Sequence, residues 1–336
     1  MPRRRLGLGL AGLWGSCSVS RLSCLGLLLF LVSRLSASSW GLIDQPQTFP
    51  WTVGLTPVVQ EEAGGLDPGE SRIRSSVLWF NTYRQYGIDQ TMEQRIDMEG
   101  LLATTSGAWS PAPGWELRAQ VQGWSLGGGF MDYFLSGFHG AISVPDQGRN
   151  QTGENEYRDY LKGIFDDRSP ATGLTQASFG VRGFSGPWSW SGWAKIPVPR
   201  HQGWGWSHRW GGGSSVSWGE VWPWPQPGLK FGAGLTAALV AVGPDSSVPG
   251  EKGPFTVQGA GYGAVGGQGW RALVQANWTG VNRDGGGYLS QGAGLLTLGC
   301  QVPLDSRWLL EGAVTEEFLT WATMEVGFQA GIAWKF

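Results

Sequence analysis

The feature that most constrains the fold of this chain is an alternation of apolar and polar side chains that recurs along most of its length. In the stretch WRALVQANW, Trp270 and Val274 share one face, whereas Arg271 and Gln275 share the other. Because successive side chains of a β-strand point to opposite faces, such stretches predict two-faced strands and an all-β protein. Comparable stretches lie at 92–99, 115–122 and 229–239.

Alternation alone does not decide which face is buried. A soluble β-sandwich buries the apolar face, whereas a membrane barrel turns it to lipid and keeps the polar face in its lumen. Two observations favour the barrel: charged residues stand in the middle of the polar faces, and Trp270 and Trp278 share a face eight residues apart. At ~3.3 Å per residue they are roughly 26 Å apart along a tilted strand, near the separation of the two aromatic girdles of a barrel.

The end of the chain, MEVGFQAGIAWKF, is a strictly alternating stretch that closes on Phe336. Bacterial outer-membrane barrels commonly end on an aromatic residue in this way, and the barrel-assembly machinery reads that pattern. The alternative is an ordinary last strand that ends on Phe by chance. The candidate assembly signal comprises Phe328, Ile332, Trp334 and Phe336.

The spacing of turns predicts a transmembrane antiparallel β-barrel of about twelve strands over residues 73–336. Short turns such as SGP, GGQG and LDS fall on the side of the C-terminus, and the other connections are mostly longer and more polar, as in outer-membrane barrels. The expected strands lie near 73–85, 91–105, 114–125, 174–184, 188–198, 213–222, 229–242, 254–265, 268–281, 292–303, 307–317 and 320–336.

Residues 1–39 read as a secretory signal peptide. Arginines precede the apolar run CLGLLLFLV, and small residues follow it, with cleavage expected after Ala37 or Ser39. The alternative, a retained anchor, needs roughly 20 apolar residues, and this run is shorter. Residues 40–72 are expected to form a periplasmic or plug segment before the barrel.

Cleavage changes the charge and the cysteine content. The formal net charge is −2, and five arginines leave with the signal, so the mature charge is −2 − 5 = −7. An acidic exported protein is a poor nucleic-acid binder, because phosphate contacts need clustered Lys and Arg. Cys300 is the one cysteine left, so the sequence predicts no intramolecular disulfide, no zinc cluster and no cofactor.

The segment 127–149 breaks the alternation. Phe130, Phe134 and Phe138 recur at a spacing of four residues, which predicts a helical insert. Asp132, Ser136 and His139 fall on one face, but all three would rise from one rigid rod without an evident oxyanion hole, so a catalytic triad is not expected. We expect an amphipathic helix that narrows one mouth of the barrel, with Arg149 anchoring its end.

These motifs together resemble the domain-of-unknown-function 3187 family of exported bacterial proteins, which are outer-membrane barrels by prediction. The resemblance is carried by the WE of the 115–122 strand, the Gly-rich GFMD, a helix with His139, the VPDQGR turn, IDMEG and VTEEF. Two places depart from the family pattern, namely DQPQTFP and KIPVPR. The resemblance implies the location and the fold, and it implies no activity.

The sequence therefore predicts a bacterial outer-membrane barrel, most simply a partly plugged small-solute channel or a translocation barrel. A barrel enzyme acting on lipid or lipopolysaccharide and a structural or adhesive barrel are the alternatives. The expected partners are outer-membrane lipid, lipopolysaccharide, the assembly machinery and an unknown small solute. The candidate lumen or insert residues are Arg95, Asp97, Glu99, Glu116, Arg118, Asp132, His139, Arg149, Arg271, Glu316 and Glu317.

Overall fold

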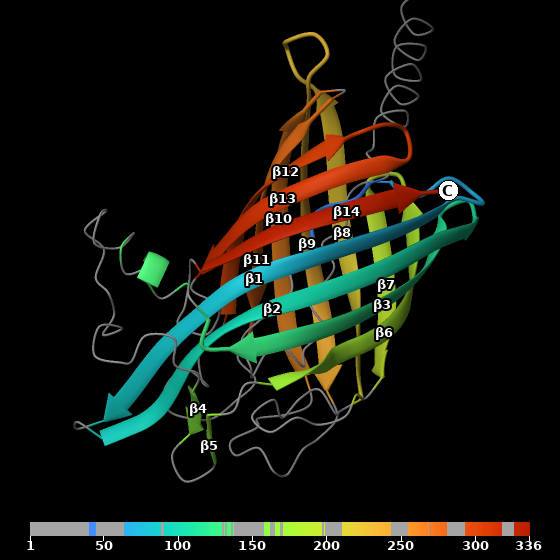
Figure 1. Cartoon of the computed structure of the whole chain (residues 1–336). Helices are drawn as coiled ribbons and strands as arrows, with labels where there is room; N and C mark the ends of the chain where they lie inside the picture. The colour runs from blue at the N-terminus through green and yellow to red at the C-terminus, as the bar shows by residue number, and fades with distance from the viewer. Residues whose placement is uncertain are drawn as a thin grey trace, which may run out of the picture. The chain divides into compact units, whose positions relative to one another are not determined.

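The structure is a computed structural model, and most of the described residues lie in an antiparallel β-sheet (Figure 1). It describes residues 40–44, 64–88, 91–129, 131, 133–135, 137, 158–161, 165–168, 171–196, 198, 210–242, 255–267, 269–280, 293–317 and 326–336. The strands are β1 (Ser71–Ile88), β2 (Thr91–Ala112), β3 (Trp115–Gly127), β4 (Arg158–Leu161), β5 (Phe165–Asp167), β6 (Ala171–Ser185), β7 (Trp188–Ile196), β8 (Gly211–Pro223), β9 (Lys230–Val242), β10 (Phe255–Gly266), β11 (Arg271–Thr279), β12 (Ala293–Pro303), β13 (Trp308–Glu317) and β14 (Val326–Lys335).

The sheet closes on itself, because β1 is hydrogen-bonded to β14 on one side and to β2 on the other. Of the fourteen strands, the short β4 and β5 form an extension on one edge of β2, which leaves 14 − 2 = 12 strands in the ring. A closed antiparallel barrel of twelve strands was predicted, and the described residues confirm it. The observed strands match the expected ones to within a few residues, except that β2 is longer and β14 shorter.

The two ends of the barrel differ in their connections. The turns at 113–114, 186–187, 224–229, 267–270 and 304–307 all lie at the end where the chain terminates, which we call the short-turn end. The opposite end, the long-loop end, carries the longer connections and the two-residue connection between β1 and β2. At the short-turn end the last residue is held in place: Phe336 N–H donates to Ser71 O, and Ser71 N–H donates to Phe336 O.

The outward face of the wall is an apolar belt. Val274 is 40% exposed, whereas its neighbour Gln275 is 1% exposed on the interior face, as the alternation predicted for β11. Exposed apolar side chains at this level are stable only in contact with lipid, as in membrane barrels. The belt includes Val77, Leu101, Trp109, Leu117, Val121, Val216, Leu235, Leu239, Val257, Leu298, Val302, Leu310, Val314 and Ile332.

The half of β2 nearest the long-loop end reverses this pattern, and here the prediction was wrong. The β1–β2 ladder runs without a shift from Ser71↔Trp109 to Arg84↔Ile96, so Glu99 must share the outward face with Leu101. The same alternation turns Arg95 and Asp97 outward and Ile96 inward. On β2 the belt ends at Leu101. Beyond this residue the strand is not in contact with lipid, so its outward side chains need not be apolar. The inward apolar residues here are Leu78, Phe80, Ile96, Met98, Leu102, Trp124 and Leu126.

The predicted insert contains helix in its described part, at Met131, Tyr133–Leu135 and Gly137. Within the described ranges, no helix is long and apolar enough to cross a membrane. The proposed signal peptide at 1–39 and most of the insert lie outside the described residues.

Candidate functional site

The inner face of the barrel wall is lined by small hydroxyl and amide side chains. Several pair across neighbouring strands, such as Ser217 with Thr236 and Thr297 with Thr315, each at 2.8 Å between side-chain oxygens. Such pairs satisfy polar groups that would otherwise be costly to bury. The lining includes Ser76, Thr104, Gln122, Gln176, Ser189, Ser215, Thr256, Gln258, Gln275, Asn277, Gln301 and Gln329.

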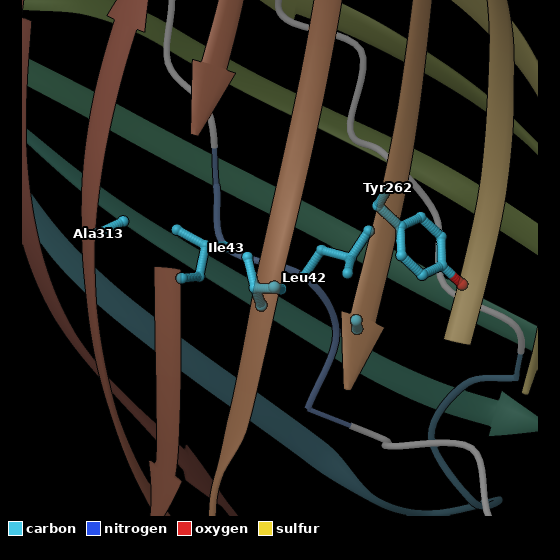
Figure 2. Packing of buried hydrophobic residues seen from close by; sticks show 6 residues of the cluster. Leu42, Ile43, Tyr262 and Ala313 are labelled. Atoms are coloured by element: carbon cyan, nitrogen blue, oxygen red, sulfur yellow. The ribbon is translucent and has the colours of Figure 1, made fainter. Parts of the chain in front are cut away.

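Residues 40–44 lie inside this lining. Ile43 and Leu42 pack against Tyr262 and Ala313 of the wall, together with Ala264 and Leu273 (Figure 2). The amide of Gln275 binds the backbone of Ile43 twice: Ile43 N–H donates to Oε1 at 3.2 Å, and Nε2 donates to Ile43 O at 2.9 Å. One glutamine thus pairs with the segment as a neighbouring strand would.

Arg74 of β1 is the centre of a second set of contacts to the same segment. Its guanidinium donates to the carbonyl oxygens of Trp40 and Leu42, and its Nη1 lies 3.8 Å from Asp44 Oδ1. On the other side, Arg74 Nε lies 3.5 Å from Oε2 of Glu311, a carboxylate that is itself buried. Arg74 therefore joins the segment to the wall and also balances the charge of the buried Glu311 carboxylate.

Two further wall residues hold the start of the segment. Gln301 Nε2 donates to Gly41 O at 3.1 Å and lies 3.3 Å from Oε2 of Glu311. Lys335 Nζ lies 4.2 Å from the ring centroid of Trp40, a cation–π contact. Residues 40–44 are thus held by β1, β14, β13, β12 and β11, which are consecutive in the ring, and Tyr262 of the next strand, β10, adds to the contact.

A second piece of the N-terminal segment contacts a different wall. Leu66 is 2% exposed, and its N–H donates to Glu116 Oε1 at 2.9 Å. The other oxygen of Glu116 pairs with Arg118 at 2.6 Å and lies 3.7 Å from Arg182 Nη1. Gly65 lies so close to Glu116 that an added Cβ would come within 2.6 Å of its carboxylate. The described parts of 40–67 therefore occupy the lumen near the short-turn end.

The structure separates the candidate residues into three groups. Glu116 and Arg118 lie together on the interior face, and Arg271 also points inward, with Nη1 3.4 Å from Gln301 Oε1. Glu316 shares the exposed outward face of β13 with Val314, so its predicted place in the lumen was wrong. The register of β13 turns Glu317 inward, but its side chain lies outside the described residues, as do Asp132, Ser136, His139 and Arg149.

Arg95, Asp97 and Glu99 form the third group, on the outward face rather than in the lumen. Arg95 Nη2 and Asp97 Oδ2 are 2.8 Å apart, with both side chains almost fully buried. Three residues of the candidate assembly signal, Phe328, Ile332 and Trp334, lie on the outward face of β14. The fourth, Phe336, follows the strand, and Trp334 stacks on it with ring centroids 4.5 Å apart.

Sequence reasoning missed the residues that hold the N-terminal segment, chiefly Arg74, Gln301, Glu311 and Lys335. Each stands at a polar position of an alternating stretch, so the sequence predicts that its side chain points inward. The sequence does not predict which residue it contacts, because the contacts of Gln275 and Gln301 to the segment join residues 232 and 260 positions apart. Among the described residues, no group of three or more His, Cys, Asp and Glu is placed to hold a metal ion.

The comparisons with known proteins agree with this geometry. The family model described as Protein of unknown function (DUF3187) matches residues 47–165, about a third of the chain, which confirms the resemblance there. The fold matches the COG4313 outer membrane channel from Pseudomonas putida F1 with a TM-score of 0.53 at 8% identity, covering 81% of this chain and 97% of that chain. The chain therefore has the fold of an outer-membrane β-barrel.

Two looser likenesses are LpxR from Salmonella typhimurium and the translocator domain of the autotransporter NalP from Neisseria meningitidis. Their TM-scores are 0.45 and 0.40, at 8% and 12% identity. They cover 78% and 81% of this chain, and 99% and 90% of their own chains. No curated protein matches the sequence.

Proposed function

We propose that this protein is a passive outer-membrane channel for small solutes, restricted by the N-terminal segment in its lumen. The observation that carries the proposal is the pairing of a polar barrel lining with a chain segment held mainly by side-chain hydrogen bonds. Barrels of eight strands are filled by side chains and those of sixteen leave an open pore, so twelve strands leave room for one such segment.

The contacts that hold the segment favour restriction over a permanent seal. Most of them join side-chain amides or a guanidinium to backbone carbonyls. Water can replace each amide bond at a net cost of about 0.5–1.5 kcal/mol and each guanidinium bond at about 1.5–3 kcal/mol. The apolar contribution comes from Leu42 and Ile43 within the lumen cluster. A segment held in this way can leave the wall without unfolding the closed sheet behind it.

The charge of the described interior suggests which solutes pass. Among its buried or half-buried side chains on the barrel strands and on residues 40–44, there are seven cations and three carboxylates, a net 7 − 3 = +4, whereas the mature chain would carry −7 after the proposed cleavage. Rings of Lys and Arg favour anions in pores, so we propose a preference for small anionic solutes. The cations are Arg72, Arg74, Arg118, Arg182, Lys195, Arg271 and Lys335, and the carboxylates are Asp44, Glu116 and Glu311.

Export and assembly are part of the proposal. Cleavage of a signal peptide after Ala37 or Ser39 would place the new N-terminus at Ser38 or at Trp40, and this end of the chain could then enter the barrel at the short-turn end as the barrel closes. The assembly machinery would read β14 and its terminal Phe336, and lipid and lipopolysaccharide would contact the belt. N-terminal sequencing of the exported protein tests the cleavage, and a polar tail added after Phe336 should lower the yield of folded barrel in the outer membrane.

The test of the channel is conductance in planar bilayers. The mature protein is compared with a variant in which residues 40–44 are replaced by a Gly-Ser stretch of equal length. We expect a small conductance for the mature protein and a several-fold larger one for the variant, with a reversal potential in a KCl gradient that shows anion preference. Absence of current from both proteins, when heat-modifiable migration shows closed barrels, would overturn the channel proposal.

A further inference from the structure

The outward wall of the barrel carries a buried carboxylate that neither the lumen nor the belt explains. Glu99 is 5% exposed, although it lies on the outward face one step beyond Leu101, which is 48% exposed. Its Oε1 accepts the indole N–H of Trp79 at 2.5 Å, and its Oε2 accepts the backbone N–H of Met131 at 2.5 Å. The wall thus presents an acceptor to which the start of the insert is attached.

The chain that leads into the insert is shaped for this contact. Gly129 has a φ of +59°, and a Cβ added there would lie 2.0 Å from the carboxylate carbon of Glu99. A residue with a side chain would meet both a backbone conformation that it rarely adopts and a steric clash. The glycine therefore allows the backbone to press directly against the outer wall.

The helical residues then divide into two faces. Met131 and Leu135, four residues apart, are 0% and 3% exposed, whereas Tyr133 and Phe134 are 76% and 53% exposed. Phe134 also reaches Phe328 of β14 with ring centroids 6.4 Å apart, and Phe328 lies 6.3 Å from Trp79 of β1. The contacts of the insert run from β2 across β1 to β14, over the seam where the first and last strands close the barrel.

We infer that the described start of the insert, Met131 and Tyr133–Leu135, lies on the outside of the barrel and places Tyr133 and Phe134 in the acyl-chain and headgroup boundary of the membrane at the long-loop end. Its two exposed aromatic residues continue the apolar belt of the strands beneath them, where Val77, Leu101 and Ile332 are each at least 40% exposed. Tyr and other amphipathic rings favour this boundary, with the ring in the apolar layer and the hydroxyl at the headgroups.

The occupant of the exposed face is therefore lipid of the membrane leaflet at the long-loop end. A second protein copy would require a self-complementary surface, and water would leave two adjacent aromatic rings as an unprotected patch. Burial of Arg95 and Asp97 on the same outward face, at 6% and 2% exposure, shows that the polar wall beyond the belt is covered by chain. This inference does not depend on the channel proposal.

The test measures the depth of single cysteine labels in lipid vesicles. In a Cys300→Ala background, an environment-sensitive fluorophore is placed by Tyr133→Cys, with Val77→Cys as the control within the belt and Ser306→Cys as the aqueous control in an exposed turn. Lipids brominated near the headgroup end of the acyl chain should quench the label at 133, lipids brominated deep in the chain should quench the label at 77 more, and the label at 306 should respond to aqueous iodide alone.

A label at 133 that responds to iodide and not to brominated lipid would overturn the inference. The attachment is tested with Glu99→Ala in the Tyr133→Cys protein, with Glu99→Gln as the conservative control that keeps an acceptor oxygen. We expect Glu99→Ala to raise the mobility of the label and lower its lipid quenching. Glu99→Gln, which keeps one of the two acceptor oxygens, should change the mobility and the quenching by less. Equal behaviour of the two variants in closed barrels would contradict the role of Glu99 as the attachment point.

Discussion

Two segments that are not barrel strands lie on opposite sides of the same wall, and they are held by different chemistry. Inside, residues 40–44 are bound by amide and guanidinium groups that reach backbone carbonyls from several strands. Outside, the insert is attached by one carboxylate and continues into aromatic contacts. The difference reflects the two environments. In the lumen, polar side chains and water are available as hydrogen-bond partners. At the lipid boundary, exposed aromatic side chains are favourable, and a carboxylate is stable only when its oxygens accept hydrogen bonds.

The largest effect is expected on the inside. Arg74→Ala removes the donor to Trp40 and Leu42 and deprives the buried Glu311 of the guanidinium that lies 3.5 Å away. Loss of one partner of a buried pair costs about 3–5 kcal/mol, so the barrel should unfold at lower denaturant concentration. Urea unfolding in detergent measures this effect, and the double variant with Glu311→Gln should recover part of the loss. An unchanged midpoint for Arg74→Ala would mean that Arg74 does not hold the segment.

The next effect concerns the belt that separates the two segments. Val274→Arg puts a charge on the lipid face and should cost about 2–4 kcal/mol, whereas Asn277→Arg on the interior face of the same strand should cost much less. Folding titrations in lipid vesicles distinguish them. Equal costs would contradict the assignment of faces, and with it the claim that Glu99 lies on the outside.

The strands themselves could be predicted because each carries its own alternation, and WELRAQVQGW is enough to define β3 and its two faces. Which face of the stretch TMEQRIDMEG points outward could not be predicted, because the same alternation would occur within the belt and beyond it. What decides the direction is where the apolar belt ends, and that depends on the register with β1 and β3 rather than on the residues alone. The contacts of residues 40–44 are likewise set by partners distant in the sequence.

A smaller effect is expected at the attachment of the insert. Gly129→Val forces a side chain into the space of the Glu99 carboxylate and into a left-handed backbone conformation, at a cost of about 1–3 kcal/mol. Gly107→Val is the matched control, because nothing lies within 4 Å of a Cβ added there. The lipid quenching of a label at 133 should fall for the first variant and stay unchanged for the second.

The smallest effect separates the two segments by function. Gln301→Leu removes the donor to Gly41 O, together with the contacts of Gln301 to Glu311 and Arg271. The part of this loss that weakens the attachment of the N-terminal segment is about 0.5–1.5 kcal/mol. If the segment restricts the channel, this change should lengthen the open periods of single-channel records, because the segment leaves the wall more often. Gly129→Val should leave those records unchanged, since the insert is attached to the outer wall. The reverse outcome, in which Gly129→Val changes the open times and Gln301→Leu does not, would mean that the insert restricts the channel at its mouth and that the N-terminal segment does not.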